Sequence, residues 1–160
     1  MLSLGVTMIG VALHRDWTAL PDGTAVAVDT SAIGALRHPD AGTLELWSEA
    51  AGVPAVFTYA MAWEETRNNP NPAVRGAHGE YGRFQIKAST ARLRCPGLVV
   101  TEYEDNLACF LRMAQQDYYK CGNWRCAARI HNGSGRRAEE YAARVMATVR
   151  VIVNAKVGAV

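Results

Sequence analysis

Two adjacent carboxylates, Glu64 and Glu65, end a nearly all-apolar run in the stretch AMAWEETRNNPNPAV, residues 60–74. Apolar residues lie at helical spacing from both acids, so periodicity does not choose between them. The last turn of a helix is its negative end, and burial disfavours charge, so both effects favour a protonated carboxyl group here. A carboxyl group that keeps its proton near neutral pH can serve as a general acid. Two solvated acids at a helix end are the plainer alternative.

Two later stretches set polar residues among glycines. GAHGEYGRFQIKASTA, residues 76–91, places Gln85 in an otherwise apolar setting. Its glycines permit tight turns and a close approach of the backbone to a ligand. RIHNGSG, residues 129–135, ends an expected helix at Asn132 and Gly133. Taken singly, an ordinary hairpin and a plain helix C-cap account for these two stretches.

The elements that must hold these residues are expected to be mainly helical, because apolar side chains recur at helical spacing between turn-forming residues. The expected helices are 43–52, 53–66, 88–95, 103–121, 123–133 and 137–157. Thr43 and Ser89 are the expected N-caps of the first and third of them. Residues 70–86 are rich in glycine and asparagine and are expected to form a loop or short strands.

Length and composition fit one compact domain of 160 residues with 49% hydrophobic residues. Residues 1–42 are expected to be an N-terminal extension, irregular or with short strands, and residues 43–160 the helical domain. A net charge of +2 is too small to indicate a nucleic-acid partner. No apolar run reaches the length of a membrane span, and the apolar N-terminus lacks the basic start and cleavage site of a signal peptide.

The four cysteines allow three disulfide connectivities. A zinc site would need closely spaced pairs, and only Cys121 and Cys126 lie near each other, so no metal is expected. Our first choice pairs Cys121 with Cys126 and Cys95 with Cys109, because both bonds then close short loops. Free buried thiols are the alternative. Disulfides would indicate a cell-envelope or extracellular setting.

The order and spacing of these motifs resemble the soluble lytic transglycosylase family, which is lysozyme-like and related to goose-type lysozymes. The matching pieces are EETRNNPNPAV, GEYGRFQIKASTAR, EDNLACFLRMA, IHNGSG and YAARV, and together they span roughly residues 45–150. The resemblance implies a mainly α, lysozyme-like fold of the α+β kind. In that fold a small β or loop element forms one side of a glycan cleft.

The resemblance also chooses between the two acids. The family's catalytic glutamate directly precedes a hydroxyl residue, which makes Glu65 the catalytic residue and leaves Glu64 as a flanking residue at the surface. The substrate-binding residues that it implies are Thr66, Tyr81, Gln85, His131, Asn132 and Tyr141. His131 stands where a tyrosine is usual, and we expect it to stack on a sugar. Arg83 stands where leucine is usual, and we expect it to make the cleft edge more basic.

The activity implied is cleavage of the β-1,4 bond between N-acetylmuramic acid and N-acetylglucosamine in peptidoglycan, with a 1,6-anhydro product and no metal or cofactor. Hydrolysis usually needs two carboxylates. A goose-type-like muramidase, with Glu80 or Glu64 as the second carboxylate, is therefore the first alternative. An inactive peptidoglycan-binding or structural module is another. The expected partner is the glycan strand of peptidoglycan, and nucleic acid is not expected to bind. The chain is expected to be a monomer located in the cell envelope, outside the cell or on a virion.

Overall fold

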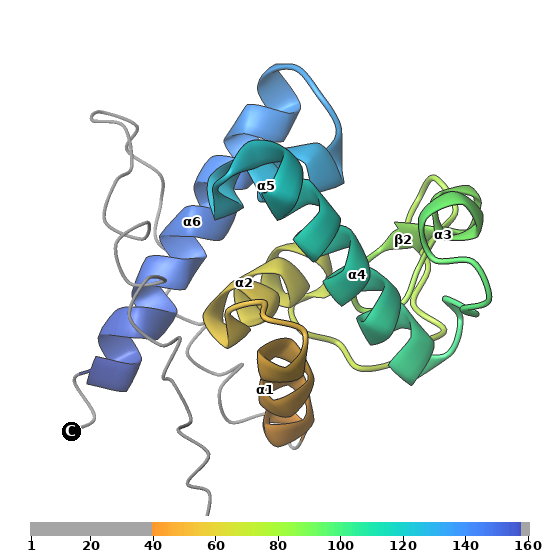
Figure 1. Cartoon of the computed structure of the whole chain (residues 1–160), viewed down its shortest axis with the longest axis horizontal. Coiled ribbons are helices and arrows are strands. Elements are labelled where there is room, and N and C mark those ends of the chain that lie inside the picture. The colour runs from red at the N-terminus through yellow and green to blue at the C-terminus, as the bar shows by residue number, and fades with distance from the viewer. Residues whose placement is uncertain (1–39, 158–160) are drawn as a thin grey trace, which may run out of the picture.

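The computed structural model describes residues 40–157, which form six α-helices and one two-stranded sheet (Figure 1). The elements are α1 (Ala41–Ala50), α2 (Ala55–Thr66), β1 (Glu80–Tyr81), β2 (Ile86–Lys87), α3 (Ala88–Arg94), α4 (Tyr103–Cys121), α5 (Trp124–Asn132) and α6 (Arg136–Val157). The expected mainly helical fold with a small β element is confirmed. The expected N-terminal extension lies, up to residue 39, outside the described residues.

Helix α2 is buried on nearly every side because it lies between α1, α4 and α6 (Figure 1). Six consecutive residues from Phe57 to Ala62 are buried, as the all-apolar sequence predicts. Pro54 precedes the first turn, where a backbone N–H would have no partner within the helix, so the proline costs no hydrogen bond. Arg67 and Asn68 adopt left-handed backbone conformations, with φ of 55° and 63°, and the helix ends at Thr66, one residue after its two acids.

Stacked aromatic rings join the helices to the small sheet. Phe84, in the β1–β2 turn, stacks on Phe110 of α4 with ring centroids 4.0 Å apart. The ring centroid of Phe57 in α2 lies 4.9 Å from that of Trp124 in α5 and 6.4 Å from that of Phe110. Rings at such distances add to the stabilisation by burial. The glycine-rich turn is therefore fixed to the core through Phe84.

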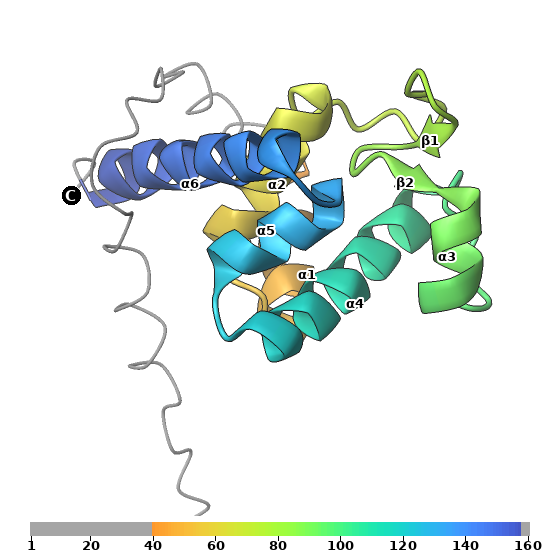
Figure 2. The same cartoon turned by 90° about the horizontal axis from the view of Figure 1, so that it is seen from above.

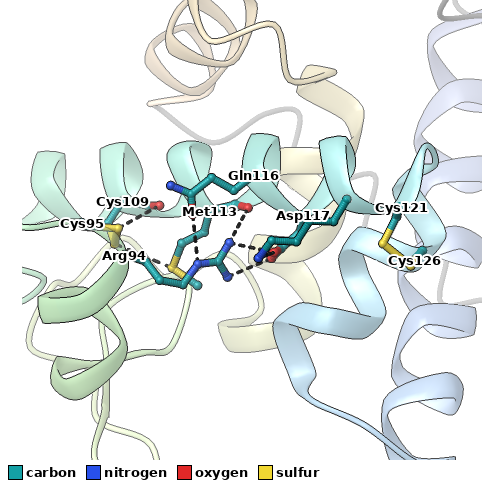
Figure 3. A network of polar contacts seen from close by, with 9 residues as sticks. Arg94, Cys95, Cys109, Met113, Gln116, Asp117, Cys121 and Cys126 are labelled. Carbon is teal, nitrogen blue, oxygen red and sulfur yellow. Dashed lines mark hydrogen bonds and ion pairs between the residues drawn. A yellow bond between two sulfur atoms is a disulfide. The ribbon is translucent and has the colours of Figure 1, made fainter.

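Two disulfides, Cys95–Cys109 and Cys121–Cys126, join the cysteines in the predicted pairs. The first ties the end of α3 to α4. Beside it, the Arg94 guanidinium donates to both carboxylate oxygens of Asp117, at 2.7 and 3.0 Å (Figure 3). This two-point contact is the strong form of an arginine–carboxylate pair. The bond and the ion pair together hold α3 against α4.

The sheet and α3 lie at one end of the molecule, and the C-terminal half of α6 extends at the other (Figure 2). Two expected N-caps are wrong. Helix α1 begins at Ala41, so Thr43 lies inside it, and α3 begins at Ala88 after Lys87, so Ser89 lies inside that helix. Within residues 40–157, no helix is long and apolar enough to cross a membrane.

Candidate active site

Glu65 lies in the last turn of α2 and lines a cleft of about 450 Å³. Only 14% of its side chain is exposed. Four more of the residues chosen from the sequence line the same cleft, namely Glu80, Gln85, His131 and Asn132. The cleft therefore brings together the ends of α2 and α5 and the β1–β2 region, as the motif order predicts.

Tyr141 reaches Glu65 from α6, and its hydroxyl donates a hydrogen bond of 2.6 Å to Oε1 of the carboxylate. The tyrosine is 3% exposed and does not line the cleft. Burial, together with the Glu65 charge and this hydrogen bond, raises the pKa of Tyr141 well above 10. The hydroxyl is therefore a neutral donor at any physiological pH, and its partner is the acid itself.

His131 approaches the same carboxylate from the last turn of α5. Its Nε2 lies 3.4 Å from Glu65 Oε1 and 3.2 Å from the Phe84 carbonyl oxygen. The ring meets Phe110 edge-on, with centroids 5.9 Å apart, and 9% of the side chain is exposed. Little of the ring surface is open to a stacked sugar, so the expected stacking role does not match this geometry.

Gln85 is held in a tight turn behind the small sheet. Its backbone is left-handed, with φ of 48°, a strained conformation for a residue with a side chain. Its side-chain amide donates to the Gly82 carbonyl at 2.8 Å, which leaves Oε1 as the free end of the side chain. A Cβ added at Gly76 would lie 2.4 Å from both Gln85 Oε1 and Glu80 Oε2. Gly76 is thus where two acceptor oxygens of the cleft converge.

Asn106 of α4 holds this turn in place, and the sequence analysis missed it. Its side chain is buried, accepts from the Phe84 N–H at 3.1 Å and donates to the Tyr81 carbonyl at 2.9 Å. A Cβ added at Gly82 would lie 2.6 Å from the side-chain nitrogen of Asn106. The absence of a Cβ at Gly82 therefore lets the Asn106 side chain approach the turn backbone closely. The available signal was an amide side chain directly before Leu107, on the apolar face of α4.

Thr66 and Tyr81 do not line the cleft. The Thr66 hydroxyl donates to the Arg83 carbonyl at 3.0 Å, so it fastens the end of α2 to the β1–β2 turn. Tyr81 is half-buried, and the Arg75 guanidinium lies over its ring at 4.9 Å. Both residues therefore support the cleft from outside it.

Two expectations about charged residues are wrong. Glu64 is not a surface residue: its side chain is 8% exposed, accepts from Thr148 at 2.9 Å and pairs with Arg144 of α6 at 3.3 Å. It does not line the cleft, so it is not placed to be a second carboxylate. Arg83 does not reach the cleft edge, because its side chain is 2% exposed and forms a 2.7 Å ion pair with Asp40.

Glu80 is the second carboxylate of the cleft. It accepts from the His78 N–H at 2.9 Å and lies 3.5 Å from Lys87 Nζ. Burial alone would raise the pKa of Glu80, but the backbone donors and the Lys87 charge outweigh it and lower that pKa below its ordinary value. Glu80 is therefore ionised at neutral pH.

No group of three or more histidine, cysteine, aspartate or glutamate residues is placed to hold a metal ion in the part of the chain from residue 40 to 157. Comparison with protein-family models, with curated proteins and with solved structures found no match for this chain.

Proposed function

We propose that this chain is a peptidoglycan lytic transglycosylase with Glu65 as its only acid and base. One observation carries the proposal. Glu65, which the motif resemblance selects, lines a cleft together with Gln85 and Asn132 from two other matching motifs. Three separate stretches of sequence thus supply one concave site, which a chance likeness of short motifs would not require.

The first step breaks the glycosidic bond. Protonated Glu65 gives its proton to the oxygen between N-acetylmuramic acid and N-acetylglucosamine, and the bond from that oxygen to C1 of the muramoyl sugar breaks. The sugar becomes oxocarbenium-like, and its own 2-acetamido group stabilises it. As the proton leaves, negative charge develops on the carboxylate. The Tyr141 hydroxyl, 2.6 Å from Oε1, stabilises that charge.

The second step restores the acid without water. Ionised Glu65 takes the proton from the C6 hydroxyl of the same sugar, and the C6 oxygen bonds to C1 to close the 1,6-anhydro ring. The carboxyl group is then protonated again and ready for the next bond. One carboxylate therefore completes the cycle, whereas hydrolysis would need a positioned water molecule.

Sugar recognition falls to the polar atoms around Glu65. The converging oxygens of Gln85 and Glu80 at Gly76 are acceptors for sugar hydroxyl groups or for an acetamido N–H. Lys87, 49% exposed at the cleft, supplies a cation for the carboxylates of the peptidoglycan peptide. The two disulfides are compatible with an oxidising location such as the cell envelope.

Paired substitutions of the two adjacent acids test the proposal. We expect Glu65→Gln to abolish the release of soluble glycan from purified peptidoglycan. Glu64→Gln is the matched control, because it makes the same change on a residue that faces α6. It should keep most of the activity while lowering the thermal midpoint, since it weakens the hydrogen bond from the buried Thr148. Full activity in Glu65→Gln would overturn the assignment. Binding to peptidoglycan without release by the unsubstituted chain would leave the binding-module alternative.

A goose-type-like muramidase is the second candidate, and the ionised Glu80 in the same cleft favours it. In that case Glu80 would activate the attacking water, and Glu80→Gln should remove turnover. In the transglycosylase, Glu80 only binds sugar, and the same substitution should raise KM and change kcat little.

A further inference from the structure

We propose that His131 is a positioning residue for Glu65: its ring N–H, anchored on a backbone carbonyl, holds one carboxylate oxygen and leaves the other to exchange the catalytic proton. The inference rests on the proposed function, since it gives a task to a neighbour of the acid. It replaces the sugar-stacking role that the sequence indicated for His131. This role requires a proton on the ring nitrogen that faces Glu65.

The carbonyl oxygen of Phe84 fixes that proton. It lies 3.2 Å from His131 Nε2. A backbone carbonyl only accepts hydrogen bonds, so Nε2 carries a proton whether the ring is neutral or charged. The same nitrogen lies 3.4 Å from Glu65 Oε1, so its proton lies close to both acceptor oxygens. His131 therefore presents an N–H beside the carboxylate in either charge state.

Oε1 of Glu65 meets a second donor from the other side of the site. Tyr141, on α6, donates to this oxygen at 2.6 Å, while His131 reaches it from α5. Within residues 40–157 these are the polar contacts of the carboxylate, and both go to Oε1. A proton placed on Oε1 would meet the Tyr141 hydroxyl hydrogen and lie beside the His131 N–H. Oε2 has neither neighbour, so it is the oxygen that carries the acid proton.

Packing keeps the imidazole in this orientation. The ring is 9% exposed, meets Phe110 edge-on at 5.9 Å and lies nearly parallel to the Tyr141 ring at 6.5 Å. A donor that is fixed before substrate arrives needs no reorganisation during the reaction. His131 and Tyr141 thus form one preorganised support for Glu65.

Two substitutions of His131 distinguish the contribution of its N–H from that of its ring. His131→Phe keeps a flat ring against Phe110 but removes the donor, and His131→Gln replaces the ring with an amide whose N–H reaches the place of Nε2. We expect kcat to fall about tenfold in His131→Phe, with KM unchanged, and to recover in His131→Gln. A role in packing alone would give the reverse order, with the Phe variant active and the Gln variant impaired.

NMR of the chain labelled at its imidazole nitrogens and Glu65 carbons tests the geometry without substrate. We expect a proton on Nε2 of His131, and a Glu65 carboxyl signal that shifts in His131→Phe and returns in His131→Gln. A neutral ring protonated only at Nδ1, an unchanged Glu65 signal or full kcat in His131→Phe would overturn the inference. If the unsubstituted chain cleaves no peptidoglycan, the proposed function fails and the two NMR signals alone decide the role of His131.

Discussion

The contact between the Tyr141 hydroxyl and the Glu65 carboxylate is the residue-scale feature that most directly serves the proposed reaction. At 2.6 Å it is a short hydrogen bond to a group that changes charge in each step. Tyr141 is buried, so the bond is shielded from water. Because its pKa is raised well above 10, the tyrosine does not lose the proton that it shares with Glu65.

Removing this donor should slow the chemical step. We expect Tyr141→Phe to lower kcat about 10- to 100-fold, because a hydrogen bond to a developing charge is worth about 1.5–3 kcal/mol, with little change in KM. Steady-state kinetics on soluble glycan chains measure both quantities. Tyr119→Phe makes the same change at a tyrosine that is 82% exposed and should have no effect. An unchanged kcat in Tyr141→Phe would show that Glu65 needs no support from α6.

At the residue scale, sequence reasoning found which residues meet but not always which way they point. Glu64 and Glu65 are neighbours on one helix, so their side chains leave it about 100° apart. One faces the cleft and the other faces α6. Apolar residues surround both positions, which is why periodicity left them equal. Arg83 was misplaced for a related reason, since its partner Asp40 is distant in sequence.

At the scale of elements, the β1–β2 turn positions Gln85 and depends on helix α4 for the contacts that hold its backbone. The Asn106 side chain accepts from the Phe84 N–H and donates to the Tyr81 carbonyl, so it holds both ends of the turn. Strands of two residues each are too short to hold a turn by themselves. Helix α4 therefore controls the shape of the cleft wall.

Substitution of this asparagine should loosen the wall. We expect Asn106→Ala to lower the free energy of unfolding by about 1–3 kcal/mol, because it leaves the buried Phe84 N–H without its acceptor. Glycan cleavage should fall as well, because Gln85 loses its fixed position. Urea unfolding and glycan release measure the two effects. Asn154→Ala, at an exposed position of α6, is the control. Equal stability of the two variants would contradict the role given to Asn106.

The helices themselves were predictable, whereas the turn was not. Helix periodicity and glycine stops locate elements within a few residues, as in α4 and α5. The N-caps of α1 and α3 were misassigned because Thr43 and Ser89 are common capping types, yet Asp40 and Lys87 occupy the caps. The shape of the turn depends on the contact between Asn106 and Phe84, which lie 22 positions apart in the sequence, and helical periodicity does not identify such a pair.

At the scale of the whole molecule, two buried tyrosines, Tyr59 and Tyr141, and the half-buried Tyr103 have raised pKa values. Burial and the nearby Glu45 and Asp40 charges raise the pKa of Tyr59 to about 12. Burial and a hydrogen bond to Asp40 raise the pKa of Tyr103 above its ordinary value, and that of Tyr141 is also raised. Tyrosines of the unfolded chain ionise near pH 10.

The fold should therefore lose stability in alkaline solution. Above about pH 10 the folded chain holds more protons than the unfolded chain, so the free energy of unfolding falls as the pH rises; below that pH the tyrosine contribution is constant. Urea unfolding between about pH 8 and 11 measures the slope. Tyr59→Phe should make the slope shallower, and Tyr119→Phe, at an exposed position, should not. A flat profile would mean that these hydroxyls ionise without cost to the fold.

The central claim is that one carboxylate in this cleft breaks the glycan strand without water. The mass spectrum of the fragments released from purified peptidoglycan tests it most directly. A transglycosylase leaves 1,6-anhydro ends, which are lighter by one water than the reducing ends of a hydrolase. We predict anhydro fragments from the unsubstituted chain and no fragments from Glu65→Gln. Reducing-end fragments alone would contradict the claim and assign the second acid to Glu80.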